Sequence, residues 1–164
     1  MRLFHQEGFG RDNIADILRR ARVSFDDASL YEAAFREWWI FGAYVVRCTV
    51  HGNCGEDMKL RDAILDLFFD ELYAGLIKRG ADVLEFPELE QLIRDRFQEY
   101  DSAYQNHSGA GPMWHLGKTV ACHLLAGRGR RTEKHVYLAL VIQSQMVVTA
   151  EAIKKFWDTV KIRR

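Results

Sequence analysis

The chain has little proline, few cysteines and no net charge. Only Pro87 and Pro112 occur among its 164 residues, and each stands where a helix can begin. Three cysteines, Cys48, Cys54 and Cys122, are too few for a complete disulfide framework, which excludes the small disulfide-stabilised folds. Lys plus Arg and Asp plus Glu number 23 each, so no global field attracts nucleic acid, an anionic membrane or a strongly charged substrate.

Long hydrophobic runs are also absent. The most apolar segment, 136–152, is interrupted at its centre by Gln143, Ser144 and Gln145, and it falls short of the roughly 18 uninterrupted apolar residues of a membrane span. The first ten residues contain charges and no apolar run, unlike a signal peptide. We therefore expect a cytoplasmic protein with reduced thiols and no membrane contact, and we interpret 136–152 as part of a core helix.

The long stretches between glycine clusters show helical periodicity rather than alternation. With 48% hydrophobic and 12% aromatic residues, the chain is long enough for one packed core. We predict an all-α fold, a single-domain antiparallel bundle of about six helices over 1–164, with an irregular segment at 1–10. The helices are expected at 11–22, 28–50, 57–79, 87–107, 112–127 and 132–161. The last is apolar on nearly every side, which predicts the centre of the bundle.

Four polar residues fall within or beside the apolar stripes of the predicted helices. Glu71 lies in the middle of the stripe of helix 57–79, and Arg96 lies in the same way in helix 87–107, so a buried Glu71 to Arg96 pair is predicted. His123 is just inside the stripe of helix 112–127, and Gln143 is in the last helix. If the four converge, they form a polar pocket for a small anionic ligand; the alternative is a structural ion pair and a hydrogen-bonded core histidine.

Two further clusters are candidate binding sites. Arg128, Arg130 and Arg131 precede the last helix, whose free amides favour an anion, although basic residues there also complement the end of the preceding helix. Cys48, His51 and Cys54 have a spacing that reaches one zinc ion, but no fourth ligand lies nearby, so zinc is only a weak candidate. Because phosphate-loop, dinucleotide and nucleophile motifs are absent, we expect no resident metal or cofactor.

Helix 28–50 is crowded with aromatic residues over more than one face, which indicates that some of them meet another surface. Ile40 falls between Arg36 and Arg47 on the polar side, and an exposed aliphatic residue flanked by arginine is typical of a protein contact. We assign Arg36, Ile40 and Arg47 to a predicted interface. The same helix begins after Asp26 and Asp27, whose charge disfavours a role as a DNA recognition helix.

These patterns favour a non-catalytic helical interaction or regulatory module that binds a protein partner or a second copy of itself through helix 28–50. Specific nucleic-acid binding is not expected. The alternative is a ligand-binding protein or enzyme, in which Arg96, Glu71 and His123 hold a small anionic molecule inside the bundle.

Overall fold

The computed structural model describes residues 9–24, 28–78, 80–106, 108–109, 111–125 and 133–159, with the side chains of the last helix described to residue 155. Within these residues the chain forms six α-helices, one 3-10 helix and no strand, so the predicted all-α fold is confirmed. The elements are α2 (Arg11–Arg20), α3 (Ala28–Cys54), α4 (Met58–Ile77), η2 (Val83–Glu85), α5 (Phe86–Tyr104), α6 (Pro112–Leu124) and α7 (Glu133–Thr159). The antiparallel order of the bundle stays a prediction.

The helix boundaries follow ordinary capping chemistry. The Asp57 carboxylate accepts a hydrogen bond from the Leu60 amide at 3.0 Å and so satisfies a free donor at the start of α4. Gly111, at φ +88°, takes a backbone conformation that L side chains rarely adopt, and Pro112 directly follows it as the first residue of α6. These local signals are readable in the sequence, which is why the predicted helix limits differ from the observed ones by at most about four residues.

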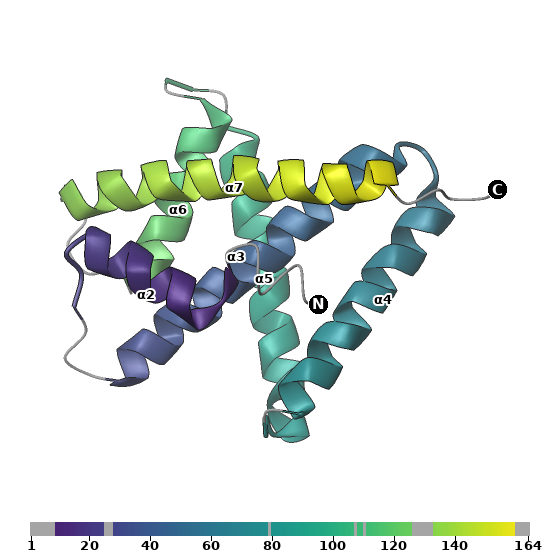
Figure 1. Ribbon diagram of the computed structural model, residues 1–164, viewed down its shortest axis with the longest axis horizontal. Helices are drawn as coiled ribbons and strands as arrows, with labels where there is room; N and C mark the ends of the chain where they lie inside the picture. The colour runs from purple at the N-terminus through teal and green to yellow at the C-terminus, as the bar shows by residue number, and fades with distance from the viewer. Residues whose placement is uncertain are drawn as a thin grey trace.

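The core is built around α3, which runs diagonally through the molecule (Figure 1). Its residues from Glu37 to Val45 are all buried, and α2, α4, α5, α6 and α7 all contact it. Aromatic rings from α3 and α5 meet edge to face: Phe41 and Tyr44 each pack against Tyr100, with ring centroids 6.2 and 5.3 Å apart. The central helix of the fold is therefore α3.

The predicted central position of the last helix is wrong. α7 runs across the molecule (Figure 1) and contacts α6, α3 and α2 through one face only. Just 22% of its most apolar 18-residue stretch is buried. The contact with α6 is close, because a Cβ added to Gly117 would lie 2.7 Å from the Ala139 carbonyl oxygen. A helix can therefore be apolar on most sides without being surrounded by neighbours.

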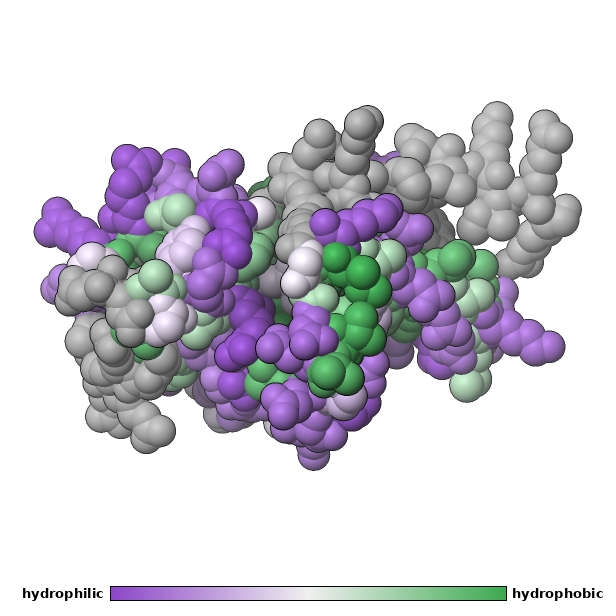
Figure 2. All heavy atoms as spheres, turned by 90° about the horizontal axis from the view of Figure 1, so that it is seen from below, coloured by the Kyte–Doolittle hydropathy of each residue, from purple (hydrophilic) through white to green (hydrophobic). Residues whose placement is uncertain are grey.

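α4 also leaves apolar surface uncovered. Leu72 is its one buried residue among those described, although the helix is rich in leucine and phenylalanine. Leu67 is exposed, and Glu71, one turn further on, is exposed with it. Figure 2 shows hydrophobic side chains gathered in a strip between hydrophilic ones, on the side of the molecule where α4 ends and α5 begins. The predicted burial of Glu71 is wrong: Phe68 and Leu72 of the same stripe pack into the core, whereas the side with Leu67 and Glu71 stays exposed.

Candidate functional site

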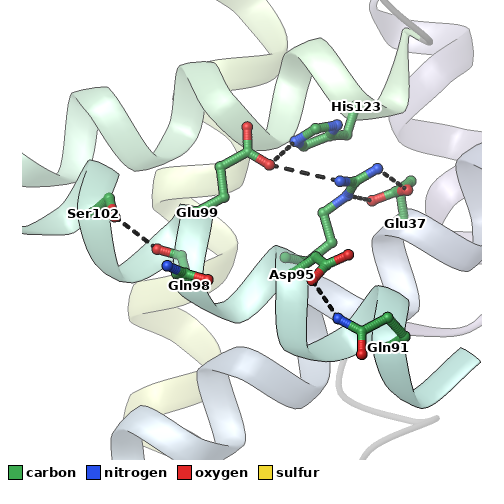
Figure 3. Close-up of polar contacts among 8 residues, drawn as sticks. Glu37, Gln91, Asp95, Gln98, Glu99, Ser102 and His123 are labelled. Atoms are coloured by element: carbon green, nitrogen blue, oxygen red, sulfur yellow. Dashed lines mark hydrogen bonds and ion pairs between the residues drawn. The ribbon is translucent and has the colours of Figure 1, made fainter.

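An ion pair between α3 and α5 occupies the interior. Arg96 of α5 donates from Nε and Nη2 to the two carboxylate oxygens of Glu37, at 2.8 and 3.0 Å (Figure 3). The Glu37 side chain is only 8% exposed. Because this geometry is bidentate and largely removed from water, it is both strong and specific. The partner of Arg96 is thus Glu37, and the predicted Glu71 to Arg96 pair is wrong.

The Arg96 pair continues into a small network that reaches α6. Glu99 lies one turn along α5, with its carboxylate 3.6 Å from Nη1 of Arg96 and 2.8 Å from Nε2 of His123 (Figure 3). The hydrogen bond to Glu37 raises the pKa of Arg96 above its ordinary value, and burial raises the pKa of Tyr100, whose ring is 6.2 Å from His123. Glu99 therefore contacts both Arg96 and His123, and the network joins α3, α5 and α6.

A second arginine clamp joins α3 to α5. Arg47 of α3 donates from both terminal nitrogens to one carboxylate oxygen of Asp101, each at 3.0 Å, and Tyr44 donates to the other oxygen at 3.1 Å. The Arg47 guanidinium also lies 5.3 Å from the centre of the Phe97 ring. Arg47 is thus engaged inside the chain. Its predicted role in an interface stays a prediction, because the side chain is still 28% exposed.

Ile40 is fully buried, so the predicted contact surface around it is wrong. The helix-wheel position between two arginines suggested exposure, but Arg47 itself folds onto α5 and closes that side of α3. Arg36 is the one member of the predicted trio that is exposed. Helix α3 is therefore buried on all sides from Glu37 to Val45, the segment that contains Ile40.

The predicted pocket of Glu71, Arg96, His123 and Gln143 does not form. Glu71 is exposed on α4, while Arg96 and His123 are bound in the network through Glu99. Gln143 is half-buried on α7, and its side-chain nitrogen has no hydrogen-bond partner among the described residues. With most of its donors directed at Glu37 and Glu99, Arg96 is poorly placed to anchor a ligand.

The other two predicted clusters give no site. Arg128, Arg130 and Arg131 lie outside the described residues. Cys48, His51 and Cys54 all belong to α3, and no group of three potential metal ligands gathers within the described part of the chain. Burial raises the pKa of the Cys48 thiol, which disfavours the thiolate that zinc binds. The structure gives the zinc alternative no support.

The outer face of α7 is the most extended apolar surface found on any one described helix. Five large side chains are exposed there at helical spacing: Val136, Tyr137, Leu140, Val147 and Val148. Leu140, near the middle, is 54% exposed. The small residue Ser144 lies between Leu140 and Val147 on the same face. We call this surface the α7 stripe.

Exposed charged residues stand at both ends of the α7 stripe, and the two lysines that lie on the stripe are both at its C-terminal end. Glu133 is exposed at the N-terminal end, and Glu151, Lys154 and Lys155 are exposed at the C-terminal end. Lys134 is exposed too, but it lies to one side of the stripe, because successive helical residues turn by about 100°. None of the five forms an ion pair with another described residue. An apolar strip rimmed by unpaired charges is the usual form of a protein contact surface.

Glu37 is the important residue that the sequence-based prediction missed. Its neighbours on the helix at positions 33, 34, 40 and 41 are alanine, isoleucine and phenylalanine, so this carboxylate lies in an apolar stripe, as Arg96 does. That signal was available in the sequence. The identity of its partner was not, because Arg96 lies 59 positions away.

Compared with family models, curated proteins and solved structures, the chain gives no match. The class that the fold and these surfaces define is therefore broad: an all-α helical domain with a closed polar interior and an open apolar stripe.

Proposed function

We propose that this chain is a non-catalytic helical interaction module that self-associates through the α7 stripe. The observation that carries the proposal is the exposure of Val136, Leu140, Val147 and Val148 along one face of a helix whose other face is packed. Covering such side chains yields roughly 25 cal/mol for each Å² of apolar surface removed from water. The closed Arg96 network supports this function over an internal ligand site.

The charges favour a second copy of the chain, arranged antiparallel, as the partner. In an antiparallel pair, Glu133 of each copy meets Lys154 and Lys155 of the partner subunit. A parallel pair instead places Glu133 beside its own equivalent and the lysines beside theirs, which is repulsive. An interface of the antiparallel kind is self-complementary, as a twofold axis requires.

The spacing of the stripe suits a twofold axis near Ser144. With the axis there, Leu140 lies beside Val148 of the partner subunit, and Tyr137 can donate a hydrogen bond to Glu151 of the partner subunit. Ser144 meets its own equivalent, and its small side chain permits a close approach of the two helices. The apolar centre and the charged ends are thus matched at one register.

Membrane insertion of α7 is the competing explanation for the same apolar surface. By length and composition alone, Glu133–Lys155 is able to cross a membrane, with a mean hydropathy of 1.5. Its inner face, however, includes Leu138, Ala139 and Ile142, which are buried against the bundle. Insertion would remove that face from the core and carry the charge of Glu151 into the lipid. Self-association leaves the core intact.

Sedimentation of the wild type and of Leu140→Asp tests the proposal. We expect the wild type to dimerise with rising concentration, while Leu140→Asp stays monomeric because it places carboxylates in the apolar centre of the interface. Leu67→Asp on α4 is the matched control, since it makes the same change at another exposed leucine, and it should dimerise normally. A wild type that stays monomeric at high micromolar concentration overturns the proposal, and so does equal loss in both variants.

Charge reversal tests the antiparallel order. Glu133→Lys should weaken the dimer, because the introduced lysine then faces Lys154 and Lys155 of the partner subunit. Combining it with Lys154→Glu and Lys155→Glu should restore much of the association. A parallel dimer would gain nothing from the combined change, since like charges would still face each other. Circular dichroism on each variant checks that the helices are retained.

A further inference from the structure

A groove separate from α7 opens between α3 and the start of α5. It has a volume of about 860 Å³ and is lined from α2, α3, the end of α4, η2 and α5. Its apolar lining includes Phe35 and Trp39 of α3, Leu76 of α4, and Phe86, Leu89 and Leu92 of α5. The volume is that of a site for a large apolar group or for several side chains.

The wall formed by η2 and the first turn of α5 is acidic. Asp82, Glu85 and Glu88 line the groove, all three are exposed, and none forms an ion pair with another described residue. One Asp82 oxygen accepts a hydrogen bond from the Leu84 amide at 2.9 Å, which fixes this carboxylate in place. Three unneutralised carboxylates along one wall favour a cationic occupant.

The opposite wall balances only part of this negative charge. Arg11 is held in a bidentate pair with Glu32, with 2.6 Å between Nη2 and Oε2, and its guanidinium lies 4.5 Å from the centre of the Phe35 ring. That pair is neutral as a unit. Arg36 is then the one unpaired cation among the lining residues. The lining as a whole has two positive and four negative side chains.

Two exposed aliphatic residues of η2 lie between groove-lining carboxylates in the sequence. Leu84, between Asp82 and Glu85, is 85% exposed, and Val83 beside it is also exposed. A turn that presents a leucine and a valine among carboxylates suits a ligand with both an apolar face and positive charge. Amphipathic helices that carry lysine or arginine at the edge of their apolar face have this chemistry.

We propose that this groove docks a basic amphipathic helix of a partner protein. The apolar face of that helix packs on Leu76, Leu89 and Leu92, and its cationic edge faces Asp82, Glu85 and Glu88. This inference is independent of self-association, because no residue of α7 lines the groove. The chain then has two surfaces, one for its own copy and one for a different protein.

Fluorescence anisotropy with two synthetic helical peptides tests the proposal. Both have about four turns, with leucine at i, i+3, i+4 and i+7; one has lysine at the remaining positions and the other has glutamate. We expect the lysine peptide to bind saturably, with an affinity that falls as salt is added, and the glutamate peptide not to bind. Glu85→Lys with Glu88→Lys should weaken binding of the lysine peptide at least about tenfold.

Two further variants show whether the groove is the site. Asp66→Lys with Asp70→Lys, on an exposed face of α4, changes the net charge by the same amount and should leave binding within about twofold. Ala33→Trp, which fills the groove from α3, should abolish binding without a new charge. Failure of the lysine peptide to bind, equal weakening by the two charge-reversed pairs, or tighter binding of the glutamate peptide through Arg36 overturns the proposal. The dimer measured by sedimentation is unaffected by any of these outcomes.

Discussion

Helices α3 and α7 have the same length, 27 residues, and the same general apolar character, but they occupy opposite positions in the fold. Eleven residues of α3 are buried, in an almost unbroken run. Among the described side chains of α7 five are buried: His135, Leu138, Ala139, Ile142 and Thr149. An apolar helix therefore forms the centre of a fold when neighbours cover it, and it presents an exposed apolar face when they do not.

The largest expected effect is the difference in unfolding free energy between two aspartate substitutions, Ile40→Asp in α3 and Leu140→Asp in α7. Ile40 is fully buried, so Ile40→Asp should cost about 4 kcal/mol or more of unfolding free energy, through an unpaired buried carboxylate and lost packing. Leu140→Asp should cost less than about 0.5 kcal/mol in the monomer. Urea unfolding, at a concentration where the wild type is monomeric, measures both. Similar losses would remove the distinction between the two helices.

The next effect concerns the ion pair that joins α3 to α5. Arg96→Leu should cost about 3 kcal/mol, because it leaves the Glu37 carboxylate buried without a partner. Adding Glu37→Leu should recover much of that loss, since no charge is then left uncompensated. Thermal and urea unfolding of the two variants give the values. A double variant that is less stable than the single one would contradict this account of the pair.

Two glycine-to-alanine substitutions test how closely the inner face of α7 packs on α6. Gly117→Ala should cost about 1 to 3 kcal/mol, because the new methyl group meets the Ala139 backbone and forces α6 from α7. Gly52→Ala, in α3 with open space around the position, should instead stabilise by about 0.5 kcal/mol through helix propensity. Chemical unfolding of both variants measures these changes in unfolding free energy. A harmless Gly117→Ala would mean that α7 is not closely docked on α6.

The smallest expected effect is a pH dependence of the unfolding free energy that comes from His135, near the start of α7. Burial lowers the pKa of His135 below its ordinary 6.5, so the unfolded chain binds the proton more readily. Above pH 6.5 this histidine therefore does not reduce the unfolding free energy. As the pH falls below that value, protonation of the unfolded chain lowers the unfolding free energy. His135→Leu should flatten the decline in unfolding free energy between about pH 7 and 5. An unchanged slope would indicate another titrating group, such as His51, whose pKa is also lowered by burial.

The helices were predictable because their limits depend on nearby residues. Asp57, Pro87, Gly111 and Pro112 act within one turn, and they set the starts of α4, α5 and α6. The pair of Glu37 and Arg96 was half predictable. Arg96 was identified from its place in an apolar stripe, and Glu37 had the same signal, but the pairing of residues 59 positions apart depends on how helices pack.

Burial was the property that the sequence did not determine. Glu71 and Leu67 lie in an apolar stripe of α4, yet no described helix covers that side, so both are exposed. Ile40 lies between two arginines, yet Arg47 turns back to Asp101 and Ile40 is buried. A helical wheel shows which residues share a face, but it does not show whether another helix lies against that face.

The most direct test of the central claim is disulfide cross-linking of single cysteines placed on the α7 stripe. In an antiparallel dimer centred near Ser144, Ser144→Cys meets its own equivalent, whereas Val136→Cys lies about 24 Å from its own along the helix. We expect mild oxidation to cross-link Ser144→Cys far above the wild-type background from Cys48, Cys54 and Cys122, and Val136→Cys no more than that background. Absence of cross-linking at Ser144, or equal cross-linking at both positions, would contradict the antiparallel interface on α7.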